Sequence, residues 1–145
     1  MNRPTILHIE DDPNDVLLLE HACRKASVSC DIRRVADGDE AIAYLRGIDG
    51  FADREKFPLP RLILLDLKMP RLNGFDVLEW LGKHDKFRTV PVVVLSSSNH
   101  DADLKRAYEL GVNSYLIKPV SFDSLVEIVK AIHDYWLTLN TPVPG

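Results

Sequence analysis

The sequence has no long hydrophobic run, because its apolar stretches end after four or five residues, as at residues 62–65. A helix that crosses a membrane needs about 20 apolar residues, so we expect no membrane association. Residues 1–4 also lack the hydrophobic segment of a secretion signal and lead directly into a strand-like run. We therefore expect the protein to be cytoplasmic.

Basic residues are not in surplus either. The chain has 18 Lys and Arg against 22 Asp and Glu, a formal net charge of −4, and a pI near 5.7. Because contact with nucleic-acid phosphates usually needs a basic patch, we expect no nucleic-acid partner. The two cysteines, Cys23 and Cys30, have neither a disulfide framework nor a metal-binding spacing, so we interpret them as small packing residues.

Glycine and proline are also scarce, at 7 and 9 residues of 145. These counts exclude a collagen-like or low-complexity chain. The chain is 46% hydrophobic, which offers enough apolar surface to offset the entropy lost on folding. Its length is close to that of one ordinary domain, so we predict a single domain over residues 1–145.

Apolar runs of strand type alternate with segments of helical spacing. The predicted strands are residues 6–9, 30–35, 62–65, 90–95 and 114–117. The predicted helices follow Asp12, span residues 37–45, 74–81 and 102–110, and begin again after Ser121. Strands that are apolar on both faces must be covered on both faces by crossover helices. The pattern therefore predicts an α/β fold with a five-stranded, doubly wound parallel sheet.

Polar side chains follow the ends of four of these strands. They are Glu10 and Asp11 after the first strand, Asp66 after the third, Ser96 at the fourth and Lys118 after the fifth. Each has an ordinary structural explanation, such as a solvated loop or a turn, and Asp12 we assign to helix capping. Ligands of doubly wound sheets bind at the carboxyl ends of the strands. The coincidence of position therefore favours a functional site.

The chemistry of these groups suits a divalent cation and a phosphoryl group. Carboxylates held together repel unless a cation neutralises them, and an all-oxygen set of ligands favours Mg²⁺. Glu10, Asp11 and Asp66 with Mg²⁺ and Lys118 have no net formal charge. Such a site permits in-line attack by a carboxylate on a phosphoryl group, and the added negative charge would attract a nearby hydroxyl such as that of Ser96.

These motifs together resemble the receiver domain of two-component response regulators, the CheY-like family with a flavodoxin-like (βα)₅ fold. The resemblance spans residues 5–135 and rests on residues 9–12, 66–70 with 73–74, 94–97 and 115–119. It implies a stand-alone regulator rather than an enzyme, one that catalyses only its own phosphorylation and dephosphorylation. The phosphoryl donor would be a sensor histidine kinase.

The resemblance also assigns roles to individual residues. Asp66 would accept the phosphoryl group. The metal ligands would be Asp11 directly, Glu10 through water, Asp66, and the backbone carbonyl of Lys68. Ser96, Lys118 and the rotating aromatic Tyr115 would form the switch, and the Lys118–Pro119 bond is expected to be cis. Lys68 and Ser98 would lie where the family adjusts the lifetime of the phosphoryl group.

Two segments depart from most receivers: a long connection over residues 46–60, and an extended last helix and tail over residues 133–145. Both are similar to single-domain regulators paired with bacterial and cyanobacterial phytochromes, which makes a bacterial phytochrome a candidate partner. The helix beyond Ile132 would expose an apolar patch, and we expect it to form a homodimer. The patch consists of Tyr135, Trp136, Leu137 and Leu139.

Two other functions fit the sequence less well. An aspartyl-phosphate-forming phosphatase or phosphotransferase of haloacid-dehalogenase type would need a second Asp two residues after the nucleophile, where this chain has Lys68, and a large cap insertion. A pseudo-receiver would lack one of the acids or the lysine, and all of them are present.

Overall fold

The computed structural model describes residues 3–69 and 72–144, so Pro70 of the motif at residues 66–70 and the last tail residue, Gly145, lie outside it. Its strands pair in parallel in the order β2-β1-β3-β4-β5. The strands are β1 (Thr5–Ile9), β2 (Asp31–Val35), β3 (Leu62–Leu65), β4 (Val92–Ser96) and β5 (Ser114–Ile117). The helices are α1 (Pro13–Ala26), α2 (Gly38–Arg46), α3 (Gly74–Gly82), α4 (Asp101–Glu109), α5 (Phe122–Ile132) and the π-helix η1 (His133–Leu139).

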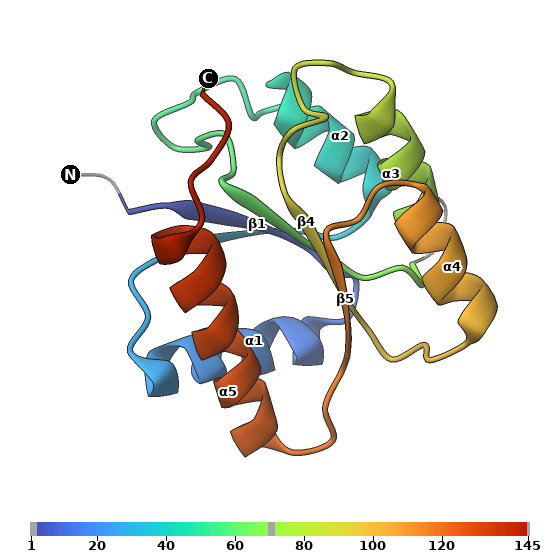
Figure 1. The fold of residues 1–145 in the computed structure, drawn as a ribbon. Helices are drawn as coiled ribbons and strands as arrows, with labels where there is room; N and C mark the ends of the chain where they lie inside the picture. The colour runs from blue at the N-terminus through green and yellow to red at the C-terminus, as the bar shows by residue number, and fades with distance from the viewer. Residues whose placement is uncertain (1–2, 70–71, 145) are drawn as a thin grey trace.

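Helices cover both faces of the sheet, as the strand pattern predicts. Figure 1 shows α1 and α5 together on one face and α2, α3 and α4 on the other. Because side chains alternate along a strand, Leu7 and Ile9 of β1 pack beneath α2 to α4, whereas Ile6 packs beneath α1 and α5. The predicted α/β fold with a five-stranded parallel sheet is confirmed, and among the described residues no helix is long and apolar enough to span a membrane.

The helix starts follow from local sequence. The Asp12 side chain accepts a hydrogen bond from the Asn14 N–H and caps α1, as predicted. Asn73 and Asp76 form a reciprocal capping box at the start of α3. A Cβ at Gly74 would lie 2.6 Å from the Asp66 carbonyl oxygen, so glycine there lets α3 begin directly against the loop that follows β3.

The connection between α2 and β3 is held by one guanidinium. Arg54 Nη1 donates to the carbonyl oxygens of Tyr44 (2.8 Å) and Phe57 (3.1 Å), and Arg54 Nη2 donates to the Leu45 carbonyl (2.8 Å). Phe57 packs edge to face against Phe51 and against the Tyr44 ring, and the Phe51 ring contacts the Tyr44 ring at a tilt of 47°. Arg54 thus joins the Tyr44 and Leu45 carbonyls of the last turn of α2 to the Phe57 carbonyl, and the connection packs onto the α2 side of the core.

The last helix corrects one expectation. The predicted exposed patch includes Leu137, but its side chain is buried on the α1 and α5 side of the core, and Trp136 also packs there. The reason is the change to a π-helix after Ile132. In a π-helix each N–H donates to the carbonyl five residues earlier, as the Asn140 N–H does to the Tyr135 carbonyl. Residues five apart therefore share a face of the helix, so Leu137 lies on the same buried face as Ile132. Tyr135 and Leu139 are exposed, as predicted.

Candidate functional site

Main-chain hydrogen bonds continue the sheet one residue past the strand ends and align the predicted site residues. The Asp66 N–H donates to the carbonyl of Ile9 at 3.0 Å, which places Asp66 beside Glu10. The Lys118 N–H donates to the carbonyl of Ser96 at 2.8 Å. Parallel pairing therefore brings the ends of β1, β3, β4 and β5 to one edge of the sheet, as the sequence analysis expects.

Three carboxylates form a cluster at this edge. One oxygen from each of Glu10, Asp11 and Asp66 lies within 4.8 Å of the others. Glu10 and Asp66 are buried, and Asp11 is partly exposed toward solvent. An all-oxygen set with an open side suits a hard divalent cation that keeps part of its water shell. The residues present therefore fit a divalent metal.

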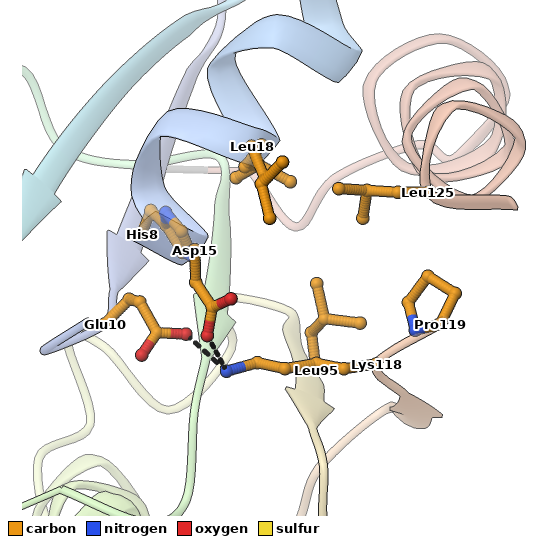
Figure 2. A pocket seen from close by; sticks show the side chains of 9 residues that line it. His8, Glu10, Asp15, Leu18, Leu95, Lys118, Pro119 and Leu125 are labelled. Atoms are coloured by element: carbon orange, nitrogen blue, oxygen red, sulfur yellow. Dashed lines mark hydrogen bonds and ion pairs between the residues drawn. The ribbon is translucent and has the colours of Figure 1, made fainter. Parts of the chain in front are cut away.

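Lys118 projects into the cluster from the end of β5. Its Nζ lies 2.7 Å from Glu10 Oε1, 2.7 Å from Asp15 Oδ2 and 3.7 Å from Asp66 Oδ2. Figure 2 shows the ammonium between the carboxylates of Glu10 and Asp15, at one end of a pocket between α1 and the β5–α5 loop. Although burial lowers the pKa of Lys118, the hydrogen bonds to Asp15 and Glu10 outweigh it and raise the pKa above its usual value. Lys118 is therefore a permanent cation.

Glu10 is the most buried acid of the site, with 1% of its surface exposed. The pKa of Glu10 is raised to about 7, because burial, with the help of the nearby Asp66 carboxylate, outweighs the opposing hydrogen bond from Lys118. The Asp12 N–H also donates to Glu10 Oε2 at 3.2 Å. Without Lys118, burial would hold Glu10 in its neutral form.

Two further charged residues, which the strand-end pattern does not indicate, belong to this site. Asp15 binds Lys118, as described above. Arg34 of β2 donates from Nε to the Glu10 carbonyl (3.0 Å) and from Nη2 to the Asp11 carbonyl (3.2 Å). The site then holds the four carboxylates of Glu10, Asp11, Asp15 and Asp66 and the two cations Lys118 and Arg34. A bound divalent cation still brings the formal charge of this set to zero. Asp15 lies in the first turn of α1, which begins directly after the site acids at the end of β1, and this position is the signal in the sequence that could have revealed it.

His8 lies beneath the acids. Its side chain is buried, and His8 Nδ1 has no hydrogen-bond partner among the described residues. Burial, with smaller contributions from the positive charges of Lys118 and Arg34, lowers the pKa of His8 to about 3. The imidazole is therefore neutral at physiological pH and adds no charge to the site.

The predicted switch residues are linked through the loop between β4 and α4. Ser96 is fully buried at the end of β4, and its Oγ accepts a hydrogen bond from the Ser98 N–H at 3.3 Å. The Tyr115 ring is buried, and its hydroxyl donates to the Ser98 carbonyl at 2.9 Å. A movement of this loop would therefore be transmitted to Tyr115 on β5.

Lys68 and Ser98 both contact Asp103 at the start of α4. Ser98 Oγ donates to Asp103 Oδ2 at 2.6 Å, and Lys68 Nζ lies 3.1 Å from the same oxygen. The hydrogen bond from Ser98, followed by that from Lys68, lowers the pKa of Asp103. Lys68 thus connects the loop after β3 with the start of α4, and the metal role of its backbone carbonyl stays a prediction.

One expectation about the site is wrong. No peptide bond between described residues is cis, so the Lys118–Pro119 bond is trans. The trans form is the more stable one for an X–Pro bond, and the Lys118 ammonium reaches both Glu10 and Asp15 with it. Cys23 and Cys30 are free and half-buried, and both pack at the edge of the α1 and α5 side of the core.

Comparisons with known proteins agree with this architecture. The sequence model of the family described as "Response regulator receiver domain" matches residues 6–130. The probable methanogenesis regulatory protein FilR2 of Methanothrix harundinacea is 41% identical over 97% of this chain and 88% of its own length.

Solved structures that resemble the whole chain include two phytochrome-related or metal-bound response regulators. The phosphorylated cyanobacterial phytochrome response regulator RcpA has a TM-score of 0.89 and 35% identity, over 99% of this chain and 100% of its own. The Mn²⁺-bound form of response regulator Rcp1 has a TM-score of 0.85 and 32% identity, over 97% of this chain and 99% of its own.

Proposed function

This chain belongs to the response regulator receiver domain family, and we propose that within it Asp66 accepts the phosphoryl group. The observation that carries the proposal is the position of the Asp66 carboxylate. It lies in a cluster of three acids, with a lysine ammonium 3.7 Å away and no other cation contact among the described residues. Glu10, by contrast, is hydrogen-bonded to Lys118, so Asp66 is the buried acid that is free to attack.

The reaction is a direct transfer from phosphohistidine to Asp66. A carboxylate oxygen of Asp66 forms a bond to phosphorus while the N–P bond of the donor breaks and the imidazole leaves with the electron pair. Lys118 screens the phosphoryl oxygens from one side. A divalent cation, which we propose to be Mg²⁺ held by Glu10, Asp11, Asp66 and the Lys68 carbonyl, would supply further charge neutralisation when bound.

The transfer would then act on the loop after β4. Phosphorylation adds negative charge at Asp66, and Ser96 at the end of β4 supplies the predicted hydroxyl donor. Because Ser98 follows Ser96 and accepts from Tyr115, a shift of Ser96 toward the phosphoryl group would pull on the Tyr115 hydroxyl. We infer that the surface around β5 changes in this way and carries the signal to a protein partner.

A sensor histidine kinase is the donor that the family implies. The structural relatives named for phytochrome signalling support a bacterial phytochrome as the specific kinase, whereas FilR2 is named for methanogenesis. The test is phosphotransfer from a panel of radiolabelled histidine kinases, a phytochrome kinase among them. We expect rapid transfer from the cognate kinase to the wild type and none to Asp66→Asn, and transfer to both would overturn the assignment.

We also propose that Tyr135 and Leu139, which are 51% and 73% exposed, contribute to a homodimer contact. Leu137 has no part in it because it is buried. Sedimentation of the wild type should show a dimer, and the double variant Tyr135→Ser with Leu139→Ser should be monomeric. A wild type that sediments as a monomer at tens of micromolar would overturn this proposal.

A further inference from the structure

Lys118 divides its hydrogen bonds between an acid of the cluster and an acid outside it. Glu10 and Asp15 each take one bond at 2.7 Å, although Asp15 lies on the first turn of α1 and is not among the three clustered acids. The distance from Lys118 Nζ to Asp66 Oδ2, 3.7 Å, is longer than a hydrogen bond. The ammonium therefore rests closer to Asp15 than to the proposed phosphoacceptor.

We propose that Asp15 is a positioning residue that retains Lys118 away from Asp66 and thereby lowers the affinity of the unphosphorylated site for a phosphoryl group. The inference rests on the proposed function. An ammonium has three N–H donors, and two of them are already directed to carboxylates. The third N–H is left for a phosphoryl oxygen, but Lys118 Nζ lies 3.7 Å from Asp66 Oδ2, so an approach of the ammonium to Asp66 would lengthen its contact with one of its two present partners.

Asp15 is the partner that can release the lysine. Glu10 is almost fully buried, also accepts from the Asp12 N–H, and belongs to the carboxylate cluster, so its side chain is fixed. The Asp15 side chain is 32% exposed, and its ion pair is with Lys118. An exposed carboxylate recovers hydration when an ion pair opens, whereas a buried one does not. Asp15 thus competes with the phosphoryl group for the same cation.

Beryllofluoride, a phosphoryl mimic that binds carboxylates, provides the test. Its dissociation constant is measured by calorimetry with saturating Mg²⁺ for the wild type, Asp15→Asn, and the control Glu20→Gln. The control removes the same charge from the same helix, outside the pocket around Lys118. We expect about three- to tenfold tighter binding for Asp15→Asn, with a smaller gain at high salt, and a change of less than about twofold for Glu20→Gln.

Two further measurements separate positioning from other effects. In a Lys118→Ala background, Asp15→Asn should change the beryllofluoride affinity by less than about twofold, because no lysine remains to be released. The affinity for Mg²⁺ alone should change little, since Asp15 is not a proposed ligand. Because Asp15 also supports the start of α1, Asp15→Ser is measured in parallel, and thermal unfolding shows that each variant is folded.

Each outcome decides the inference. Unchanged or weaker beryllofluoride binding by both folded Asp15 variants would overturn it, and so would an undiminished effect in the Lys118→Ala background. If the wild type binds no beryllofluoride, the proposed function itself fails. Tighter binding by both Asp15 variants, dependent on Lys118, supports it.

Discussion

The Tyr115 hydroxyl donates a hydrogen bond to the Ser98 carbonyl at 2.9 Å, and this bond joins the central loop of the site to the edge strand of the sheet. Both residues are buried, so neither group has water as a ready substitute. Because of this contact, the position of the Tyr115 ring depends on the position of the β4–α4 loop.

Replacing Tyr115 by Phe should therefore loosen the loop without harming the acid cluster. The lost hydrogen bond leaves the Ser98 carbonyl unpaired, and we expect the free energy of unfolding to fall by about 1 kcal/mol in urea titrations. The control is Tyr108→Phe, because the Tyr108 side chain is half exposed. Equal stability of Tyr115→Phe and Tyr108→Phe would show that the Tyr115 bond is not maintained in solution.

Arg54 should matter for stability but not for phosphorylation. Arg54→Ala removes a guanidinium that binds three carbonyl oxygens, and we expect the free energy of unfolding to fall by about 2–3 kcal/mol. The exposed Arg46→Ala is the matched control. The rate of labelling by acetyl phosphate should stay the same for both variants, and a slower rate only in Arg54→Ala would indicate that the connection at residues 46–60 supports the site.

The buried histidine should make the fold sensitive to acid. The unfolded chain protonates His8 near pH 6.5, but burial lowers the pKa of His8 to about 3 in the folded state. Between these two values the unfolded state binds more protons, so the stability that His8 contributes is lost as pH falls from 6.5 toward 3. Glu10, with its pKa raised to about 7, acts in the opposite direction, so a variant comparison is needed to isolate His8.

The comparison is between the wild type and His8→Leu in urea titrations at pH 7.5 and pH 5. Relative to the variant, the wild type should lose about 2 kcal/mol of unfolding free energy over this interval. A constant difference between the two proteins would mean that His8 titrates normally in the folded state.

The carboxylate cluster should bind Mg²⁺ through Glu10. We expect Glu10→Gln to raise the dissociation constant for Mg²⁺ by about tenfold or more in calorimetric titrations, because it removes a charge from the cluster. Glu20→Gln again serves as the control for net charge. If Glu10→Gln and Glu20→Gln bind Mg²⁺ alike, the metal lies elsewhere.

Strand topology alone predicts both the sheet and the proximity of Glu10, Asp66 and Lys118. Parallel strands end at the same edge, so the residue after each strand is placed there by backbone pairing alone. This rule does not predict Asp15 or Arg34. Asp15 lies in α1, and Arg34 reaches the site from β2 with its long side chain.

The expectations that failed depend on local conformation rather than on topology. The burial of Leu137 results from a π-helical hydrogen-bond pattern. The sequence of residues 133–139 does not predict this pattern, because apolar spacing is normally interpreted at the α-helical period. The cis bond expected before Pro119 came from the family resemblance, whereas the dipeptide alone favours the more stable trans form.

The most direct test of the central claim is intact-protein mass spectrometry after incubation with acetyl phosphate and Mg²⁺, followed by mapping of the modified peptide. The wild type should gain one phosphoryl group, located on Asp66, and should gain none when the metal is chelated during the reaction. Asp66→Asn should gain none under either condition. Equal labelling of the wild type and Asp66→Asn, or a phosphoryl group mapped to another residue, would contradict the account.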